Sequence, residues 1–348
     1  MKKILFIAFV LILTACHSNQ NKDSHLDIPD QNAGPKSREV NVKIMRFDKD
    51  ILAMVKDTST KIIDTLRKRY GSFLDTTYCM QIMRMRMSND RDLRHHLTDF
   101  LTDSDVKAIY KEVDKTFPDL TDYEKDFSAA FTRFVKYFPD RNEPRIYTMI
   151  SAFNYAVVST DSAMVLGLDM FLGTDHIFYS SMGFPKYKIN RMRKEYLVPQ
   201  LIEGWMRSEF DGSNTGNDLI SQMVYNGKIY YCLDALLPTM DDTLKIGYTG
   251  KQMEWCKASE PSIWKYFIEH DLLFTADELK YAKFVTDGPT SNGMPKESPG
   301  NIGSWTGWQI VRKYMREHPD ITVKQLMENN DAQKILSESK YKPEDSGT

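Results

Sequence analysis

The chain has 348 residues, 41% of them hydrophobic, which is enough to build the core of one large domain or of two modest ones. Its 46 basic and 48 acidic side chains leave a formal net charge of −2. This balance provides no global attraction to nucleic acid or to an anionic membrane, so we expect no nucleic acid among the partners.

The first sixteen residues carry the most specific signal in the sequence. Two lysines precede a ten-residue apolar stretch that is too short to span a bilayer, and the stretch ends in Leu13-Thr14-Ala15-Cys16. This ending resembles the lipobox of bacterial lipoproteins, where a signal peptidase cleaves before the cysteine and acyl chains are attached to it. The alternative is a plain secretory signal with an incidental cysteine. We predict a lipoprotein signal peptide over residues 1–15 and lipid attachment at Cys16, which holds the mature chain on a membrane face outside the cytoplasm.

Residues 16–39 combine the lipidated cysteine with a polar stretch that has almost no apolar periodicity, which is typical of a flexible tether. Because His17 and not Asp follows Cys16, nothing favours retention in the inner membrane. The polar stretch Asn21-Lys22-Asp23 does not decide between the two faces of an outer membrane, of which we expect the periplasmic one. A single domain is predicted over residues 40–343, followed by a tail over residues 344–348.

The first part of the domain is predicted to be mostly helical. Alternating apolar residues over 40–44 indicate a short strand, and helical spacing begins at Phe47. Helices are predicted over residues 61–70 and 106–117. A further helix begins at Thr121-Asp-Tyr-Glu124, which fits a capping box ahead of an aromatic-rich apolar series. The aromatic stripe of that helix favours core packing over a ligand groove.

Two adjacent histidines in an arginine-rich stretch could contribute to a metal site. His95 and His96 lie three or four residues from Asp92 and Asp99, the spacing that places side chains on one helix face. Adjacent histidines point to different sides of a helix, however. A solvated helix face is therefore the favoured interpretation.

The rest of the chain is organised around a middle block. Runs rich in β-forming residues predict a strand hairpin and a small antiparallel sheet over residues 145–150, 152–159 and 163–168. Helical spacing begins after Pro185, and Pro199 divides it into two pieces. A longer amphipathic helix is predicted from Asp218 to Leu237, where Pro238 follows.

A small sheet followed by two helices is the skeleton of many zinc peptidases, whose zinc helix carries two histidines four residues apart and a glutamate between them. The seven histidines stand at positions 17, 25, 95, 96, 176, 270 and 318, and no pair of them fits this frame. The predicted fold is mainly α, of the α+β type: a helical domain with a small antiparallel sheet, similar to a degenerate zincin-like metallopeptidase scaffold without its metal ligands. We predict no metal site and no cofactor.

After Pro238 the sequence stays helical. Thr249-Gly-Lys-Gln252 and Thr275-Ala-Asp-Glu278 fit capping boxes and predict two helix starts. The loop 286–300 is rich in glycine and proline, which indicates a mobile or partner-contacting segment. It leads into a glycine-containing run with no strand before it and no Lys-Ser/Thr pair after it. Close packing around Trp305 and Trp308 therefore explains these glycines better than phosphate binding.

The remaining cysteines are Cys79, Cys232 and Cys256, an odd number for an oxidising compartment. Either Cys232 and Cys256 form one disulfide, or all three are buried thiols. A cysteine nucleophile would need a histidine close to it in space, which spacing alone does not provide.

Several stretches, in order along nearly the whole mature chain, carry a family resemblance. They are the lipobox at Cys16, Arg46-Phe-Asp-Lys49, Tyr70-Gly-Ser-Phe73, Gly167-Leu-Asp-Met-Phe-Leu-Gly173, Glu195-Tyr-Leu-Val-Pro-Gln200, Tyr225-Asn-Gly-Lys228, Leu233-Asp-Ala-Leu-Leu-Pro238 and the run 303–311. Together they resemble the gliding motility lipoprotein GldB family of Bacteroidetes. The resemblance implies a lipoprotein needed for surface gliding and associated with the type IX secretion apparatus, without established enzymatic activity.

The family also looks distantly similar to predicted zinc peptidases whose zinc helix has been emptied. Such scaffolds are expected to carry an acidic residue before the Gly-Lys of the second helix, and this chain has Asn226 there. The departure weakens a metal role. Gly227 and Lys228 are favoured as a helix contact over a site.

Two functions from different classes remain. The first is a lipid-anchored, non-catalytic protein that contacts the membrane through its N-terminal lipid and binds envelope proteins of the gliding and secretion machinery. Its possible interaction or cleft residues are Glu195, Asn226, Lys228, Asp234, Trp305 and Trp308. The alternative is a periplasmic hydrolase or peptidase-like enzyme that uses some of Glu195, Glu203, Asp234, His176 and His270 in a cleft between the two middle helices. Acid-base work by paired carboxylates requires that burial separates their pKa values, and no catalytic signature is present, so we predict that the protein is not an enzyme.

Overall fold

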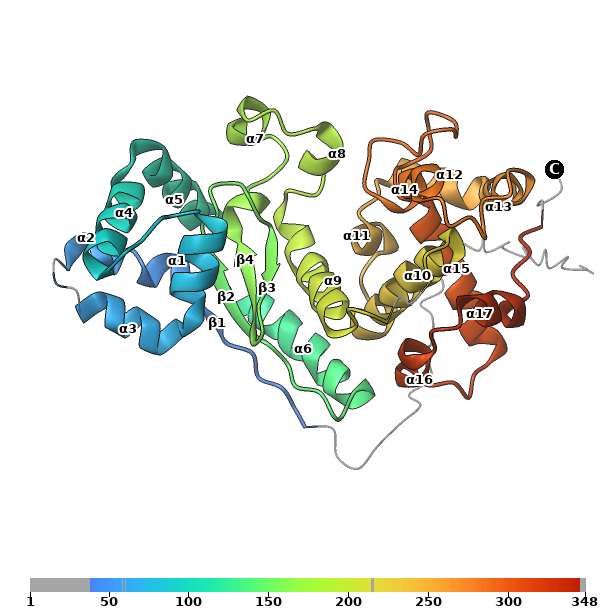
Figure 1. Ribbon diagram of the computed structural model, residues 1–348, viewed down its shortest axis with the longest axis horizontal. Coiled ribbons are helices and arrows are strands. Elements are labelled where there is room, and N and C mark those ends of the chain that lie inside the picture. Colours follow the sequence, from blue (N-terminus) through green and yellow to red (C-terminus); the bar gives the residue numbers. More distant parts are fainter. Residues whose placement is uncertain (1–37, 58, 60, 214–215, 345–348) are drawn as a thin grey trace, which may run out of the picture.

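The computed structural model describes residues 38–57, 59, 61–213 and 216–344. The predicted signal peptide, Cys16, nearly all of the tether and most of the tail lie outside the described residues. An N-terminal group of helices lies at one end of the molecule, a small sheet follows, and the C-terminal helices make up the other end (Figure 1). No helix in the described part of the chain combines the length and apolar character that crossing a bilayer requires.

The sheet has four strands in the order β1-β2-β4-β3. Their bounds are β1 (Ile44–Met45), β2 (Arg145–Met149), β3 (Val157–Ser159) and β4 (Ala163–Gly167). β1 pairs with β2 and β2 with β4 in parallel, while β3 and β4 form an antiparallel hairpin. The prediction of an antiparallel sheet was therefore wrong except for this hairpin, and β2 does not pair with β3. All five residues of β4 are buried, as parallel strands covered on both faces usually are.

The N-terminal helices confirm the prediction of a mostly helical first part. They are α1 (Phe47–Asp50), α2 (Ala53–Lys56), α3 (Lys61–Tyr70), the π-helix η1 (Phe73–Ile82), α4 (Asp90–Thr102), α5 (Ser104–Thr116) and α6 (Thr121–Tyr137). The ring of Phe47 meets Tyr70 and Tyr78 edge to face, with centroids 5.0 and 4.8 Å apart. The aromatic stripe of α6 is buried, which confirms its core role. On α4, both His95 and His96 are exposed, as a solvated helix face requires.

The predicted capping box at the start of α6 was wrong. The N-cap residue is Leu120, which has no side-chain acceptor, and the Thr121 hydroxyl donates to Asp119 Oδ1 at 2.6 Å. The Glu124 carboxylate is also engaged elsewhere. It accepts hydrogen bonds from the Ile44 amide (3.0 Å) and from Lys43 Nζ (2.8 Å). One and two turns further along α6, the hydroxyls of Ser128 and Thr132 accept from the amides of Val42 (2.9 Å) and Val40 (3.0 Å). Side chains of α6 thus cover the edge of the extended segment that enters β1, which leaves those amides unavailable to another strand.

The remaining elements follow the strands along the chain. They are η2 (Leu168–Phe171), α7 (Ile177–Ser181), α8 (Lys186–Ile189), η3 (Lys194–Tyr196), α9 (Leu197–Glu209), α10 (Leu219–Leu236), α11 (Asp242–Ile246), α12 (Gly250–Ala258), α13 (Glu260–Glu269), α14 (Glu278–Val285), α15 (Ile302–Glu317), α16 (Val323–Glu328) and α17 (Ala332–Ser339). α9 packs on β3 and β4, and α10 contacts α6, α9, α11, α14, α15, α16 and α17. The predicted helix is confirmed, but it is not amphipathic, because every residue from Asn226 to Leu236 is buried.

The break that was predicted at Pro199 lies earlier in the chain. α8 ends at Ile189 and α9 begins at Leu197, so Pro199 stands in the first turn of α9, where its missing amide would have no intrahelical partner. The capping box at Thr249 and Gln252 is confirmed, with both reciprocal bonds present. The one proposed at residues 275–278 was wrong, because α14 begins at Glu278 without a side-chain cap.

Glycines bring α10 and α15 into backbone contact. A Cβ atom on Gly227 would lie 2.3 Å from the Gly307 carbonyl oxygen, and one on Gly307 would lie 1.8 Å from the Met223 carbonyl oxygen. This confirms both close packing in the run that contains Trp305 and Trp308 and the helix-contact interpretation of Gly227. The three cysteines in the described residues are free and buried, so the alternative of buried thiols holds and no disulfide joins Cys232 to Cys256.

Candidate functional site

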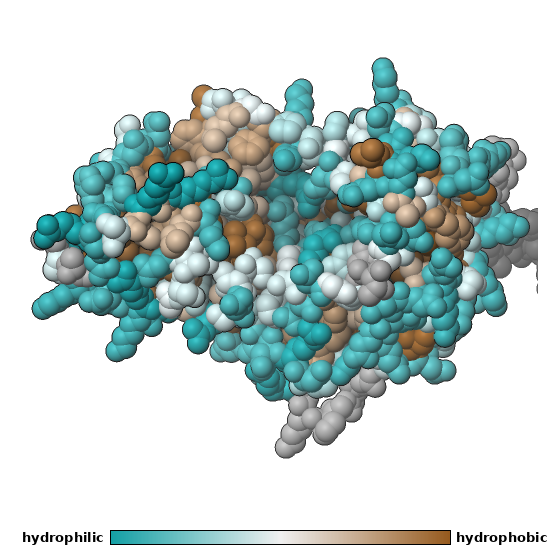
Figure 2. Space-filling view, in the orientation of Figure 1, coloured by the Kyte–Doolittle hydropathy of each residue, from teal (hydrophilic) through white to brown (hydrophobic). Residues whose placement is uncertain are grey.

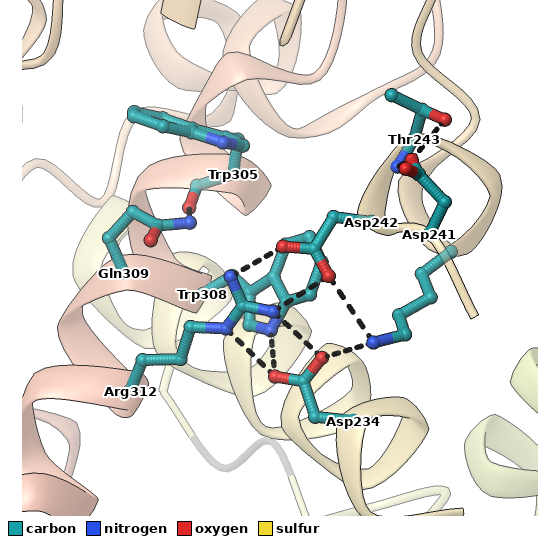
Figure 3. Close-up of polar contacts among 9 residues, drawn as sticks. Asp234, Asp241, Asp242, Thr243, Trp305, Trp308, Gln309 and Arg312 are labelled. Atoms are coloured by element: carbon teal, nitrogen blue, oxygen red, sulfur yellow. Dashed lines mark hydrogen bonds and ion pairs between the residues drawn. The ribbon is translucent and has the colours of Figure 1, made fainter. Parts of the chain in front are cut away.

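A buried charge cluster joins α10, α11 and α15 (Figure 3). Its centre is Asp234, of which 3% is exposed. Asp234 Oδ1 accepts hydrogen bonds from Lys245 Nζ and Arg312 Nη2, both at 2.8 Å. Asp234 Oδ2 accepts from Arg312 Nε at 2.8 Å and from Trp308 Nε1 at 2.9 Å. Four donors therefore converge on one carboxylate, which leaves it no free lone pair for a substrate.

Asp242 completes this cluster from α11. It accepts from Arg312 Nη1 at 2.8 Å and Nη2 at 3.0 Å, and from Lys245 Nζ at 3.2 Å. Burial alone would raise the pKa of Asp242, but the hydrogen bonds and charge of Arg312 outweigh it and hold the pKa below its usual value. The Arg312 guanidinium also lies 3.8 Å from the centroid of the Trp308 ring. Two cations thus balance two anions, an arrangement suited to holding helices together.

Lys228 lies six residues before Asp234 on α10, and its side chain reaches α16. Its side chain is buried, and Nζ donates to the carbonyls of Met327 (3.2 Å) and Asn329 (2.9 Å) at the end of α16. A cation at a helix C-terminus interacts favourably with the carbonyls that lack intrahelical partners. Burial lowers the pKa of Lys228 to about 8.

A second polar group lies between α9 and α10. Arg207 Nη1 donates to Asn226 Oδ1 at 2.9 Å, while its Nε and Nη2 donate to Glu203 Oε1 at 3.0 and 2.9 Å. Arg191 approaches the other Glu203 oxygen, at 3.8 Å. Glu203 is therefore held between two guanidinium groups, and its Oε1 already accepts two hydrogen bonds from Arg207.

A third buried carboxylate, Asp169, follows β4. It accepts hydrogen bonds from the amides of Ser151 (3.0 Å) and Phe153 (2.6 Å) in the loop after β2, where Ala152 and Phe153 adopt positive φ angles. Burial raises the pKa of Asp169 to about 6, although these hydrogen bonds oppose the shift. The residue lies in the Gly167–Gly173 motif, but its role was not predicted. It organises the loop between β2 and β3.

The structure separates the side chains of the hydrolase alternative. Glu203 and Asp234 belong to the two different groups described above, and Glu195 is exposed on η3. His176 caps α7 and lies 3.6 Å from Glu112 of α5. The exposed His270 stacks on Tyr266, with ring centroids 4.0 Å apart. These residues do not share the cleft that was hypothesised between the two middle helices.

Sequence reasoning named Asp234, Asn226, Lys228 and Trp308. It did not pair Trp308 with Asp234, and it missed Asp242, Lys245 and Arg312. A usable signal existed for the charge cluster. Trp308 and Arg312 are four residues apart on α15, and Asp242 and Lys245 are three apart on α11, so each pair shares a helix face. Trp305 and Trp308 are buried with 2% and 0% exposure, so they contribute to the core.

The loop 286–300 is folded onto the domain. Ser291 and Ser298 are buried, and both hydroxyls donate to the Pro299 carbonyl, at 2.8 and 3.1 Å. Tyr248 Oη donates to the Gly300 carbonyl at 2.9 Å. These contacts fix the end of the loop that leads into α15. Its role in contacting a partner stays a prediction.

The described residues contain no group of three or more His, Cys, Asp or Glu side chains placed to hold a metal ion. No curated protein and no solved structure gives a significant match to the chain, so the likeness to a zinc peptidase scaffold stays a prediction. The model of the gliding motility protein GldB family matches residues 30–343. The match covers nearly the whole predicted domain, together with part of the tether. The chain therefore belongs to the gliding motility protein GldB family, a family of envelope lipoproteins that is not a known enzyme family.

Proposed function

We propose that this protein is a lipid-anchored component of the cell envelope, of the kind associated with gliding motility and type IX secretion, which acts by binding partner proteins and not by catalysis. The observation that carries the proposal is the family match over residues 30–343. The lipobox that ends at Cys16 supports anchoring by acyl chains. The proposed location is the periplasmic face of the outer membrane.

The geometry of the polar residues supports a binding protein. Asp234 receives four hydrogen bonds from Lys245, Arg312 and Trp308, and Glu203 lies between Arg191 and Arg207. Catalytic carboxylates need a lone pair or a proton that a substrate can reach. The carboxylates of Asp234 and Glu203 are already hydrogen-bonded within the domain, so we assign them a structural role.

The anchor is tested by metabolic labelling of cells with a fatty acid. Cys16→Ser removes the thiol that would carry the acyl chain, so we expect the protein to lose the label, whereas the matched control Ser18→Ala keeps it. Gliding or secretion, whichever the host cell shows, should fail in the first variant and persist in the second. Retention of the label in Cys16→Ser would overturn the anchoring proposal.

Metal analysis of the purified full chain tests the non-catalytic part. We expect no stoichiometric zinc. One zinc per chain, retained after dialysis against a weak chelator, would contradict the proposal and favour the periplasmic hydrolase. Glu203→Gln would then distinguish a catalytic from a structural role of this residue. Loss of hydrolysis in a folded variant would indicate a catalytic role, whereas a loss of stability alone would indicate a structural one.

A further inference from the structure

One segment protrudes from the sheet region and exposes apolar side chains. We call residues 174–190 the α7–α8 arm; it lies above the sheet and α9 in Figure 1. Ile177 is 71% exposed and Met182 is 54% exposed. In Figure 2 the surface over α7 is a brown and tan patch, bordered by hydrophilic residues. A patch of exposed apolar side chains commonly marks a contact with another molecule.

The arm is held firmly at its base. The ring of Tyr179 is buried, and its hydroxyl donates to the Asp169 carbonyl (2.7 Å) and accepts from the Leu172 amide (2.8 Å). Phe153, in the loop that Asp169 organises, packs against Phe178 and Tyr179 with centroids 5.5 and 5.7 Å apart. Ile177 and Met182 are therefore presented on a preorganised support, which lowers the entropic cost of binding.

The charge of the arm differs from that of the chain. Residues 174–190 contain two lysines, Lys186 and Lys188, and one acidic residue, Asp175, whereas the whole chain has a net charge of −2. Lys194 follows shortly after the arm. Lys186, Lys188 and Lys194 are exposed, and none of them forms an ion pair within the part of the chain that the structure describes. The basic and apolar groups together favour an acidic partner.

The position of the tether indicates which kind of partner this is. The described chain begins at Arg38, which pairs with Glu143 and donates to Asn142. The segment then enters β1, which lies on the other side of the sheet region from α7 and α8 in Figure 1. The predicted lipid anchor precedes Arg38, so the chain enters the domain away from the arm. This entry point favours a protein over the anchoring bilayer as the partner of the arm.

We infer that the α7–α8 arm is the docking surface for an acidic envelope protein, whose apolar pocket receives Ile177 and Met182 and whose carboxylates pair with Lys186 and Lys188. The inference rests on the proposed function and names the surface and the chemistry of the partner. The apolar side chains supply most of the affinity, because the lysines lie at the rim. The lysines raise the association rate and make it depend on salt.

The test places a photo-crosslinking residue at Ile177 or Met182 of the full chain in intact cells, with Gln333 of α17 as the control position. We expect one predominant adduct with an acidic envelope protein from both arm positions and none from position 333. Lys186→Glu combined with Lys188→Glu should lower the adduct yield about tenfold. The matched control, Lys251→Glu combined with Lys296→Glu, makes the same change of charge at exposed lysines elsewhere and should leave the yield unchanged.

The partner identified in this way is then titrated with the detergent-solubilised mature chain at several salt concentrations. Binding should weaken with salt, and the Lys186/Lys188 double variant should flatten that dependence. An adduct with lipid, an adduct with a second copy of the chain, or a yield that charge reversal does not change would each overturn the inference. Protein adducts that form only at the control position 333, on α17, would overturn it and leave the proposed function intact.

Discussion

Asp234 shows at the scale of single residues how this fold accommodates a buried charge. Its carboxylate and that of Asp242 face the cations of Lys245 and Arg312, so the cluster is neutral. A buried ion pair is often no more stabilising than an apolar replacement of the same shape, but removal of one member leaves an uncompensated charge. The cluster therefore acts chiefly by fixing how α10, α11 and α15 meet.

Asp234→Asn should destabilise the domain by about 3 kcal/mol, because two cations would then face a single anion in a buried site. Urea unfolding followed by circular dichroism measures the difference in unfolding free energy. Asp122→Asn is the matched control, since the Asp122 side chain is 91% exposed, and it should change stability by less than about 0.5 kcal/mol. Equal effects of the two substitutions would contradict the assignment.

Lys228 should give stability a distinctive pH dependence. Its pKa is about 8 in the folded chain and near 10.5 in the unfolded chain, so the unfolded chain binds more protons between these values. The contribution of Lys228 to the unfolding free energy therefore rises as the pH rises through this window. In Lys228→Met this rise should be absent, while in the exposed control Lys251→Met it should persist. The unfolding free energy of each variant is measured at about pH 7 and at about pH 9.5. The same change with pH in Lys228→Met and in Lys251→Met would contradict this role of Lys228.

At the scale of elements, helices were predicted better than their ends. The capping box at Thr249 and Gln252 formed, because both residues find their partners within one turn. The one expected at Thr121 and Glu124 did not form, because Leu120 is the N-cap and the Thr121 hydroxyl donates to Asp119. The Glu124 carboxylate accepts instead from the Ile44 amide, 80 positions away, a long-range partner that a local pattern cannot show.

The predicted pairing of the strands was wrong for a similar reason. The turn between β3 and β4 was recognisable, and their hairpin is present. β2 and β4 are instead parallel neighbours, and both are almost completely buried. Strands that are apolar on both faces lack the alternation that would have indicated which face and which partner each one has.

The crossing of α10 and α15 gives a test of packing. In Gly307→Ala the new methyl group would lie 1.8 Å from the Met223 carbonyl oxygen, so the helices must separate. We expect a loss of about 3 kcal/mol in unfolding free energy. Gly250→Ala, at the start of α12, has no atom within 4 Å of the new Cβ and should be neutral or slightly stabilising. Thermal unfolding of both variants measures this, and an unchanged midpoint for Gly307→Ala would be the contrary result.

At the scale of the whole molecule, the sequence analysis identified polar residues of α10 but not the residues that they contact. Asn226, Lys228 and Asp234 were named from one helix. Their partners are supplied by α9, α11, α15 and the end of α16, at separations of 11 to 101 positions. Distances in space between such segments depend on the complete fold, so the residues could be selected but their roles could not be derived.

The segment that enters β1 allows a test of how the tether joins the domain. Glu124→Ala removes the acceptor of the Ile44 amide, so hydrogen exchange at Ile44 should become about fivefold faster, as expected for loss of one hydrogen bond. Glu124→Gln keeps an acceptor oxygen and should exchange close to the original rate. Amides in the middle of α10 should be unaffected in both variants. Mass spectrometry with peptide resolution measures these rates, and uniform acceleration would show a global effect instead.

The contacts of Val40, Val42 and Ile44 with α6 would have a mechanical consequence under the proposed function, in which a lipid holds the chain and a partner pulls on it. Tension that arrives along the tether reaches the Arg38 pair first and then the bonds of Val40, Val42 and Ile44, one after another. Each bond contributes only about 1 kcal/mol, so the segment can peel from α6 in small steps. The tension reaches the sheet and the buried charge cluster only after this segment has detached. The extended segment before β1 would thus lengthen under tension by detaching from α6 one hydrogen bond at a time.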